Sequence, residues 1–131
     1  MRMMLGVAAV AAAGAFFVAC ADDKPAATVA VKLDSFTVSS DKAEVMAGNV
    51  TFKATNAHAS EVHELAVLRV RPDGSFENLG EVEDLGPGKG GEVTIALTPG
   101  DYLLACLIAE GEAGSKVDHF AYGMRRAFTV K

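Results

Sequence analysis

Apolar and polar residues alternate along four stretches of the chain, which is the pattern of strands with one buried face. The alternating apolar positions are Val29, Val31 and Leu33; Val50, Phe52 and Ala54; Val93, Ile95 and Leu97; and Phe128 and Val130. Groups of turn-forming residues lie between the strands, at 47–49, 72–74, 86–88 and 99–101. Many short strands at this spacing, without a convincing helical period, predict an all-β fold, an antiparallel β-sandwich.

Two other stretches, Leu65–Val70 and Tyr102–Ile108, are apolar almost throughout. Strands that are covered on both faces have this composition, because neither face meets water. We therefore expect these two strands to lie in the middle of their sheets.

The first 19 residues differ from the rest of the chain. Arg2 is followed by an unbroken apolar run from Leu5 to Ala19, which is shorter than the roughly 20 residues of a membrane-spanning helix. It has the character of a secretory signal. Its end, Phe17-Val18-Ala19-Cys20, resembles a bacterial lipoprotein signal, in which the cysteine is lipidated. Ordinary cleavage after Ala19 or Ala21 is the alternative.

This interpretation divides the chain into a signal peptide (1–19), a short polar tether (20–27) and one folded domain (28–131). Both forms of cleavage imply an exported protein, periplasmic or extracytoplasmic. A lipidated Cys20 would in addition anchor it to a membrane. We expect a monomer.

Charge and cysteine content narrow the possible functions. The formal net charge is -5 and no run of lysine or arginine occurs, which argues against a nucleic-acid-binding protein. The two cysteines, Cys20 and Cys106, could form a disulfide on number alone. Their surroundings favour separate roles, because one follows the signal-like run and the other lies in an apolar strand.

Four side chains form a candidate metal site: His63, Cys106, His119 and Met124. Each residue taken alone has an ordinary explanation, as a buried cysteine, a loop histidine or a core methionine. Together they are the donor set of a type 1 (blue) copper centre, with two imidazoles, one thiolate and one weak axial thioether. The sequence therefore predicts one copper ion as the cofactor.

The motifs around these residues resemble the cupredoxin family of small blue-copper proteins. The resemblance rests on 50–52, Asn56 and 63–65; on 99–102 followed by Cys106; and on 119–124 followed by 128–130. It covers about Val29 to Lys131 and implies a Greek-key sandwich of about seven or eight strands. It further implies that the protein carries single electrons between redox protein partners, and that the ring edge of His119 reaches the surface as the electron port.

Other residues compete for these roles, and one feature departs from the family. His58 is the alternative to His63 and lies in a polar stretch, whereas His63 begins a strand. Met46 is the weaker alternative to Met124. The twelve residues from Leu107 to Asp118 form a longer loop than most cupredoxins have at this place. The loop could shield the metal, supply a partner surface or tune the potential.

Arg125 and Arg126 directly follow Met124. They are either solvated edge charges or a docking contact for an acidic redox partner. The sequence contains no recognisable constellation of catalytic residues, so we predict that the protein is not an enzyme. The remaining alternatives are a copper-trafficking or storage protein that uses the same ligands and a metal-free structural lipoprotein.

Overall fold

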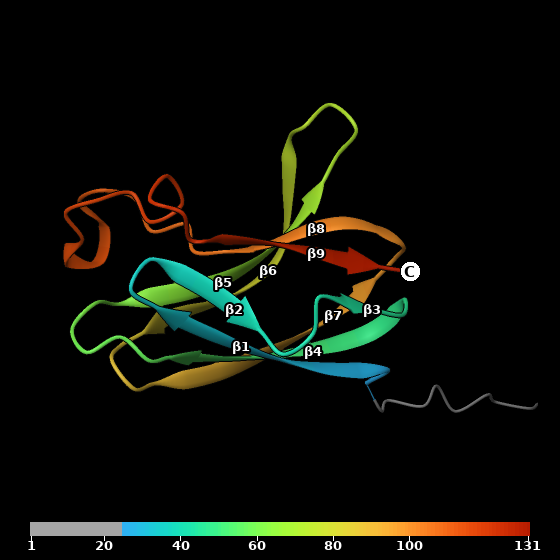
Figure 1. Cartoon of the computed structure of the whole chain (residues 1–131), viewed down its shortest axis with the longest axis horizontal. Coiled ribbons are helices and arrows are strands. Elements are labelled where there is room, and N and C mark those ends of the chain that lie inside the picture. Colours follow the sequence, from blue (N-terminus) through green and yellow to red (C-terminus); the bar gives the residue numbers. More distant parts are fainter. Residues whose placement is uncertain (1–24) are drawn as a thin grey trace, which may run out of the picture.

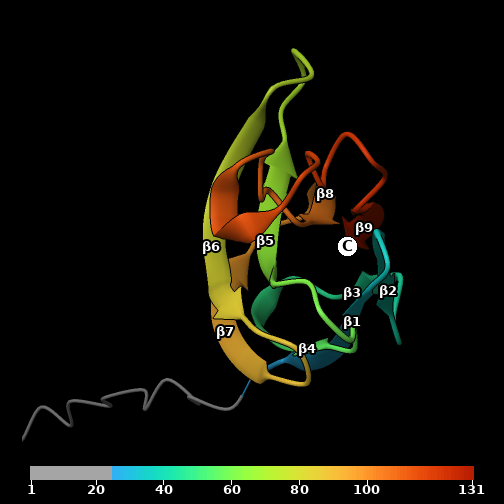
Figure 2. The same ribbon diagram turned by 90° about the vertical axis from the view of Figure 1, so that its left-hand side faces the viewer.

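The computed structural model describes residues 25–131, which form a sandwich of two β-sheets (Figures 1 and 2). The strands in chain order are β1 (Ala27–Asp34), β2 (Thr37–Ser40), β3 (Glu44–Val45), β4 (Gly48–Asn56), β5 (His63–Val70), β6 (Phe76–Leu85), β7 (Gly90–Leu97), β8 (Gly100–Ala105) and β9 (Arg125–Val130). One 3-10 turn, η1 (Glu112–Gly114), lies between β8 and β9. The predicted all-β sandwich is confirmed.

The first sheet has the strand order β2-β1-β4-β7 and the second β3-β9-β8-β5-β6. Most strand pairs are antiparallel, as predicted, but β1 pairs with β4 in parallel and β3 pairs with β9 in parallel. Residues 25–131 form nine strands, where seven or eight were expected. A parallel pair arises where the chain crosses to the other sheet before it returns, and the alternation of side chains carries no information about strand direction.

The inward residues of both sheets form one core. The alternating positions of β1 and β4 are buried as predicted, and Phe52 on one sheet packs against Phe128 on the other with ring centroids 5.6 Å apart. The predicted central strands are also confirmed, since β5 and β8 are neighbours within the second sheet. Tyr102 and Leu104 lie on the face of β8 that points into this core, and Cys106, which directly follows β8, points the same way.

One end of the sandwich brings together segments that are distant in sequence. The β1–β2 turn, the β4–β5 connection and the long segment between β8 and β9 all lie at this end, on the left in Figure 1 and facing the viewer in Figure 2. β5 begins there with His63, and β8 ends there just before Cys106. The fold therefore directs the candidate ligands toward one place.

Part of the predicted domain division falls outside the described residues. The signal-like segment (1–19) and Cys20 belong to that part, so both remain predictions. β1 begins at Ala27, the last residue assigned to the tether, and the Ala26 N–H donates to the Asn49 carbonyl over 2.7 Å. Within residues 25–131, no helix combines the length and the apolar character needed to cross a bilayer.

Candidate metal centre

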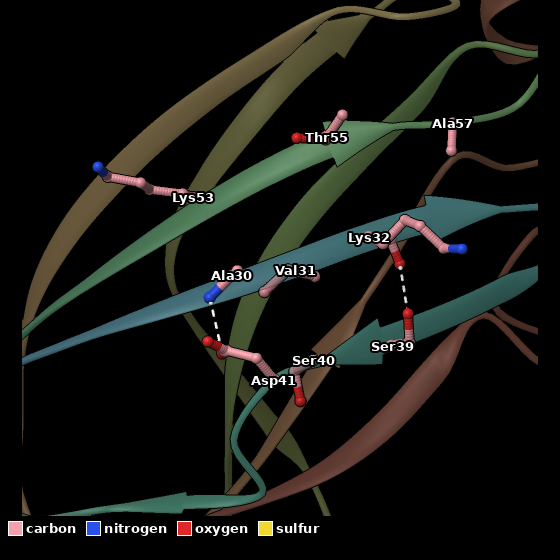
Figure 3. Close-up of a pocket in the computed structure, with 9 residues that line it drawn as sticks. All are labelled: Ala30, Val31, Lys32, Ser39, Ser40, Asp41, Lys53, Thr55 and Ala57. Carbon is pink, nitrogen blue, oxygen red and sulfur yellow. Dashed lines mark hydrogen bonds between the residues drawn. The ribbon is translucent and has the colours of Figure 1, made fainter.

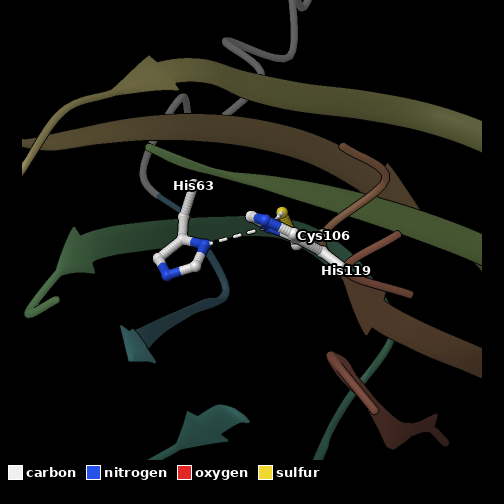
Figure 4. Close-up of side chains that lie close together, drawn as sticks. All are labelled: His63, Cys106 and His119. Atoms are coloured by element: carbon white, nitrogen blue, oxygen red, sulfur yellow. Dashed lines mark hydrogen bonds between the residues drawn. The ribbon is translucent and has the colours of Figure 1, made fainter. Parts of the chain in front are cut away.

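Three of the four predicted ligands converge in the structure (Figure 4). The Nδ1 atoms of His63 and His119 lie 3.2 Å apart, and the Sγ atom of Cys106 lies 3.3 Å from His119 Nδ1. One donor atom from each of the three residues falls within 4.8 Å of the others, and all three side chains have no exposed surface. His63 and His119 are 56 positions apart in the sequence, so only the fold could bring them together.

The spacing and the chemistry of these donors fit a bound metal ion. Two nitrogens that bind one ion at about 2.0–2.1 Å lie about 3.3–3.6 Å apart for tetrahedral or trigonal bond angles. The two Nδ1 atoms are close to that separation. Two imidazoles and one thiolate select type 1 copper when a weak axial donor completes the set. The cluster therefore fits one type 1 copper ion.

His63 is placed by the connection that precedes it. Asn56, at the end of β4, is fully buried and donates from Nδ2 to the carbonyls of Glu61 and Leu85, over 2.8 and 2.7 Å. Its Oδ1 accepts the N–H of His58 over 2.9 Å. These three bonds fix residues 57–62 and bring His63 to the start of β5 facing the core. The side chain of Asn56 thus acts as a clamp for the ligand strand.

His58 lies beside the cluster but outside it. Its ring is edge-on to that of His63 at 5.5 Å between centroids. Its Nδ1 accepts the backbone N–H groups of Ser60 and Glu61, over 3.0 and 2.9 Å. That nitrogen is therefore engaged in the turn, which agrees with the choice of His63 over His58.

Cys106 follows the last residue of β8 and is held by main-chain contacts. Its N–H donates to the Met124 carbonyl over 3.0 Å, and its Sγ accepts the Glu64 N–H over 3.4 Å. Cys106 is a free thiol. Burial raises the pKa of this thiol to about 11. In the metal-free protein at neutral pH, the sulfur therefore keeps its proton.

The two imidazoles are held neutral by the same dry surroundings. Burial, together with the nearby rings of His119 and His58, lowers the pKa of His63 to about 4. Burial also lowers the pKa of His119, although the carboxylate of Glu61 opposes this effect. A neutral imidazole is the form that binds metal, so both rings are ready to do so near neutral pH.

His119 is covered rather than exposed, and the predicted surface position of its ring edge was wrong. The imidazole has 0% exposed surface. Its Nε2 lies 2.8 Å from the hydroxyl of Ser115, and the ring of Phe36 meets it edge-on at 5.4 Å between centroids. Ser115 belongs to the long 107–118 loop, which folds back so that the His119 N–H donates to the Ile108 carbonyl over 2.9 Å. This loop and the β1–β2 turn, which carries Phe36, together supply the cover.

Met124 is fully buried in the core cluster that contains Cys106, whereas Met46 is 69% exposed. The main chain ties Met124 to two candidate ligands, because its carbonyl accepts from Cys106 and its N–H donates to the His119 carbonyl over 3.0 Å. The preceding residue, Gly123, has φ 113°, a conformation that favours glycine. The axial role of Met124 remains a prediction.

Arg125 and Arg126 are both exposed at the start of β9. The guanidinium of Arg125 lies over the ring of Phe120 at 5.0 Å and donates to the Phe120 carbonyl over 2.9 Å. One of the two charges is thus engaged within the protein. Their proposed role in partner docking remains a prediction.

Two other features of the described residues resemble binding sites. Glu64, Glu81 and Glu83 bring carboxylate oxygens together, but these side chains are half-buried or exposed and nothing beside them indicates a ligand. A hollow of about 510 Å³ lies over β1, β2 and β4, lined in part by Lys32, Lys53 and Asp41 (Figure 3). It contains no histidine or cysteine and is not continuous with the metal cluster.

The sequence reasoning missed Ser115, Phe36 and the clamp function of Asn56. Ser115 is the sole hydroxyl-bearing residue between Leu107 and Asp118, which was the only available signal for it. Phe36 gave none, because the turn that carries it lies 83 positions before His119 (119 − 36) and meets it only in the fold.

No family model matches the sequence, and no curated protein matches it. Solved structures do match. A reduced auracyanin from Roseiflexus castenholzii is 18% identical, with 81% of this chain and 97% of that chain covered and a TM-score of 0.61. Auracyanin A, a blue copper protein from Chloroflexus aurantiacus, is 19% identical over 79% of this chain and 99% of its own, with a TM-score of 0.56.

Reduced rusticyanin is similar to the same degree, at 19% identity, 82% coverage of this chain, 81% coverage of its own and a TM-score of 0.60. At such low identities the likeness establishes a shared fold. The chain therefore has the cupredoxin fold that the sequence resemblance predicted.

Proposed function

We propose that this protein is a type 1 copper protein of the cupredoxin family that carries single electrons between redox partners. His63, Cys106, His119 and Met124 would hold the ion. The observation that carries the proposal is that one donor atom each from His63, Cys106 and His119 lies within 4.8 Å of the others, and that these side chains have no exposed surface. The cupredoxin fold of the chain supports it.

Bound copper would supply one-electron chemistry by alternating between its two common oxidation states. The chain provides a dry, rigid surround for it. His63 begins β5 and Cys106 directly follows β8, the strand beside it. The Cys106 N–H donates to the Met124 carbonyl, and its Sγ accepts the Glu64 N–H. Exclusion of water disfavours the more highly charged oxidised site and should raise the reduction potential.

A redox partner would have to approach the cover over His119, because the imidazole itself has no exposed surface. Tyr122 is the exposed member of that cover, and its ring packs against Phe36 at 5.1 Å between centroids. Phe36 in turn contacts the His119 ring. We propose that the partner, a redox protein, contacts this aromatic pair, and that the exposed Arg126 adds a positive charge to the docking surface.

Copper loading and redox titration of the purified protein test the proposal. We expect an intense blue colour from thiolate-to-copper charge transfer, with one copper per chain and a fully reversible one-electron titration. A protein that stays colourless with Cu(II) bound would refute the type 1 assignment. A coloured protein whose copper cannot be reduced and reoxidised reversibly would favour copper trafficking or storage instead. The complete burial of the three donors counts against that alternative.

Replacement of Met124 by leucine is expected to preserve copper binding and to raise the reduction potential. The change removes a weak soft donor and fills the same buried volume with an apolar side chain. Copper content and an equilibrium redox titration measure the two effects. Met46→Leu is the matched control, because Met46 is largely exposed, and it should leave the potential unchanged. A potential in Met124→Leu equal to that of the wild type would remove Met124 from the axial position.

We also propose that the protein works outside the cytoplasm, held at a membrane through a lipid on Cys20. The apolar run from Leu5 to Ala19 and the cysteine that follows it support this location. Fractionation of cells that express the full chain tests it, since an unanchored protein would be recovered in the soluble exported fraction.

A further inference from the structure

The hydroxyl of Ser115 makes an unusual set of contacts for a loop serine. It is only 5% exposed and lies under the surface of the 107–118 loop. It donates to the Val117 carbonyl over 2.8 Å and lies 2.8 Å from His119 Nε2. It also accepts, at 3.3 Å, the Val117 N–H.

These contacts determine which atom carries the proton between Ser115 and His119. A serine hydroxyl has a single proton, and here the Val117 carbonyl takes it. The Ser115 oxygen can therefore only accept from the imidazole, which requires that Nε2 carry the hydrogen. A neutral imidazole has one N–H, so His119 Nδ1 is left with a free lone pair. That lone pair lies on the atom that approaches His63 Nδ1 and Cys106 Sγ.

We propose that Ser115 is a positioning residue: its hydroxyl holds His119 in the tautomer and orientation that offer Nδ1 to the metal. Metal-binding histidines generally donate their second ring N–H to a partner that fixes the ring in this way. The inference rests on the proposed function for its purpose, but the tautomer itself is a property of the metal-free protein.

Glu61 is the other polar group near this nitrogen, and it does not replace Ser115. Its Oε2 lies 3.9 Å from His119 Nε2, which is beyond hydrogen-bond distance, and its side chain is 35% exposed. The long loop between β8 and β9 therefore does more than cover His119. Its Ser115 oxygen accepts the Nε2–H of the ring, a buried donor that would otherwise be unsatisfied.

The hydroxyl of Ser115 also stabilises a local turn, so a test must separate the two roles. Ser40 provides a matched control. Its hydroxyl donates to the Lys42 carbonyl two residues ahead, over 2.6 Å, as that of Ser115 does to Val117. Loss of the Ser40 hydroxyl therefore removes the same kind of turn bond without a contact to the cluster.

The experiment is a long-range proton–nitrogen correlation spectrum of the metal-free full chain with labelled histidine, near neutral pH. We expect His119 of the wild type to be protonated on Nε2. Ser115→Ala should shift the ring toward a mixture of both tautomers, whereas Ser115→Thr and Ser40→Ala should keep the wild-type form. A wild-type ring protonated on Nδ1, or an unchanged tautomer in a folded Ser115→Ala, would overturn the inference.

Copper affinity gives a second reading. Loss of the partner of a metal-binding histidine typically weakens metal binding about 10–100-fold, so we expect a decrease of this size in Ser115→Ala and none in Ser40→Ala. An affinity in Ser115→Ala equal to that of the wild type would also refute the positioning role. Failure of the wild type to bind copper would instead refute the proposed function, while the tautomer result would stand by itself.

Discussion

Replacement of Cys106 by serine will abolish the blue colour of the copper-loaded protein completely. The colour requires a sulfur donor, because it arises from charge transfer from the thiolate to the metal. A serine hydroxyl is a hard donor that stays protonated at neutral pH, so it supplies neither the charge nor the transition. The visible absorption spectrum of the loaded protein measures the loss, and copper content shows whether any ion is retained.

The fold should survive this substitution, because one small side chain replaces another in a core of β-strands. Circular dichroism and thermal unfolding of the metal-free variant check that point. Cys20→Ser is the matched control, since it makes the same chemical change outside the predicted site and should keep the full blue band. A blue band of unchanged intensity in Cys106→Ser would mean that the charge transfer comes from another donor.

The affinity for Cu(II) will rise steeply with pH, about tenfold per unit, between about pH 6.5 and pH 11. The free thiol of Cys106 has its pKa raised to about 11 by burial, so over this range it carries a proton that copper must displace. The imidazoles add no further protons in that window, since burial lowers the pKa of His63 to about 4 and also lowers that of His119. Binding should therefore release one proton.

Titration calorimetry in buffers of different ionisation enthalpy counts the released proton, and chelator competition at several pH values measures the affinity. The sign follows from the direction of the shift, because a raised thiol pKa makes the protonated, non-binding form persist to higher pH. The Cys106→Ser variant should release no proton and show little pH dependence in the same window. Release of no proton by the wild type near neutral pH would show that its sulfur is already a thiolate.

The alternation of apolar and polar residues predicted the strands well, because the buried face of a strand is set by the residues of that strand alone. Val29, Val31 and Leu33 are buried on one face of β1, as the period of two requires. The same patterns failed on strand direction, since β1 and β4 are parallel although each would read identically in an antiparallel pair. Pairing direction depends on where the chain crosses between the sheets, which is a property of the whole topology.

In the candidate site, too, residue types could be interpreted from the sequence, whereas their surroundings depended on the fold. The residue types at His63, Cys106, His119 and Met124 by themselves indicate copper, because few metals suit two imidazoles with a thiolate and a thioether. The expectation that His119 reaches the surface was wrong, because it was carried over from a family whose loop at this place is usually shorter. Here the longer loop brings Ser115 onto the ring.

The sequence by itself determined the all-β class and the apolar surroundings of the cysteine, and it indicated the candidate donor set, since these follow from residue type and local period. Only the tertiary structure decided that His63 meets His119 across 56 positions, that Asn56 clamps the connection before β5, and that Phe36 and Ser115 close over the imidazole. The reason is physical: a donor atom is specified by chemistry within one residue, whereas its burial and its hydrogen-bond partner are supplied by segments that only the packing of two sheets brings together.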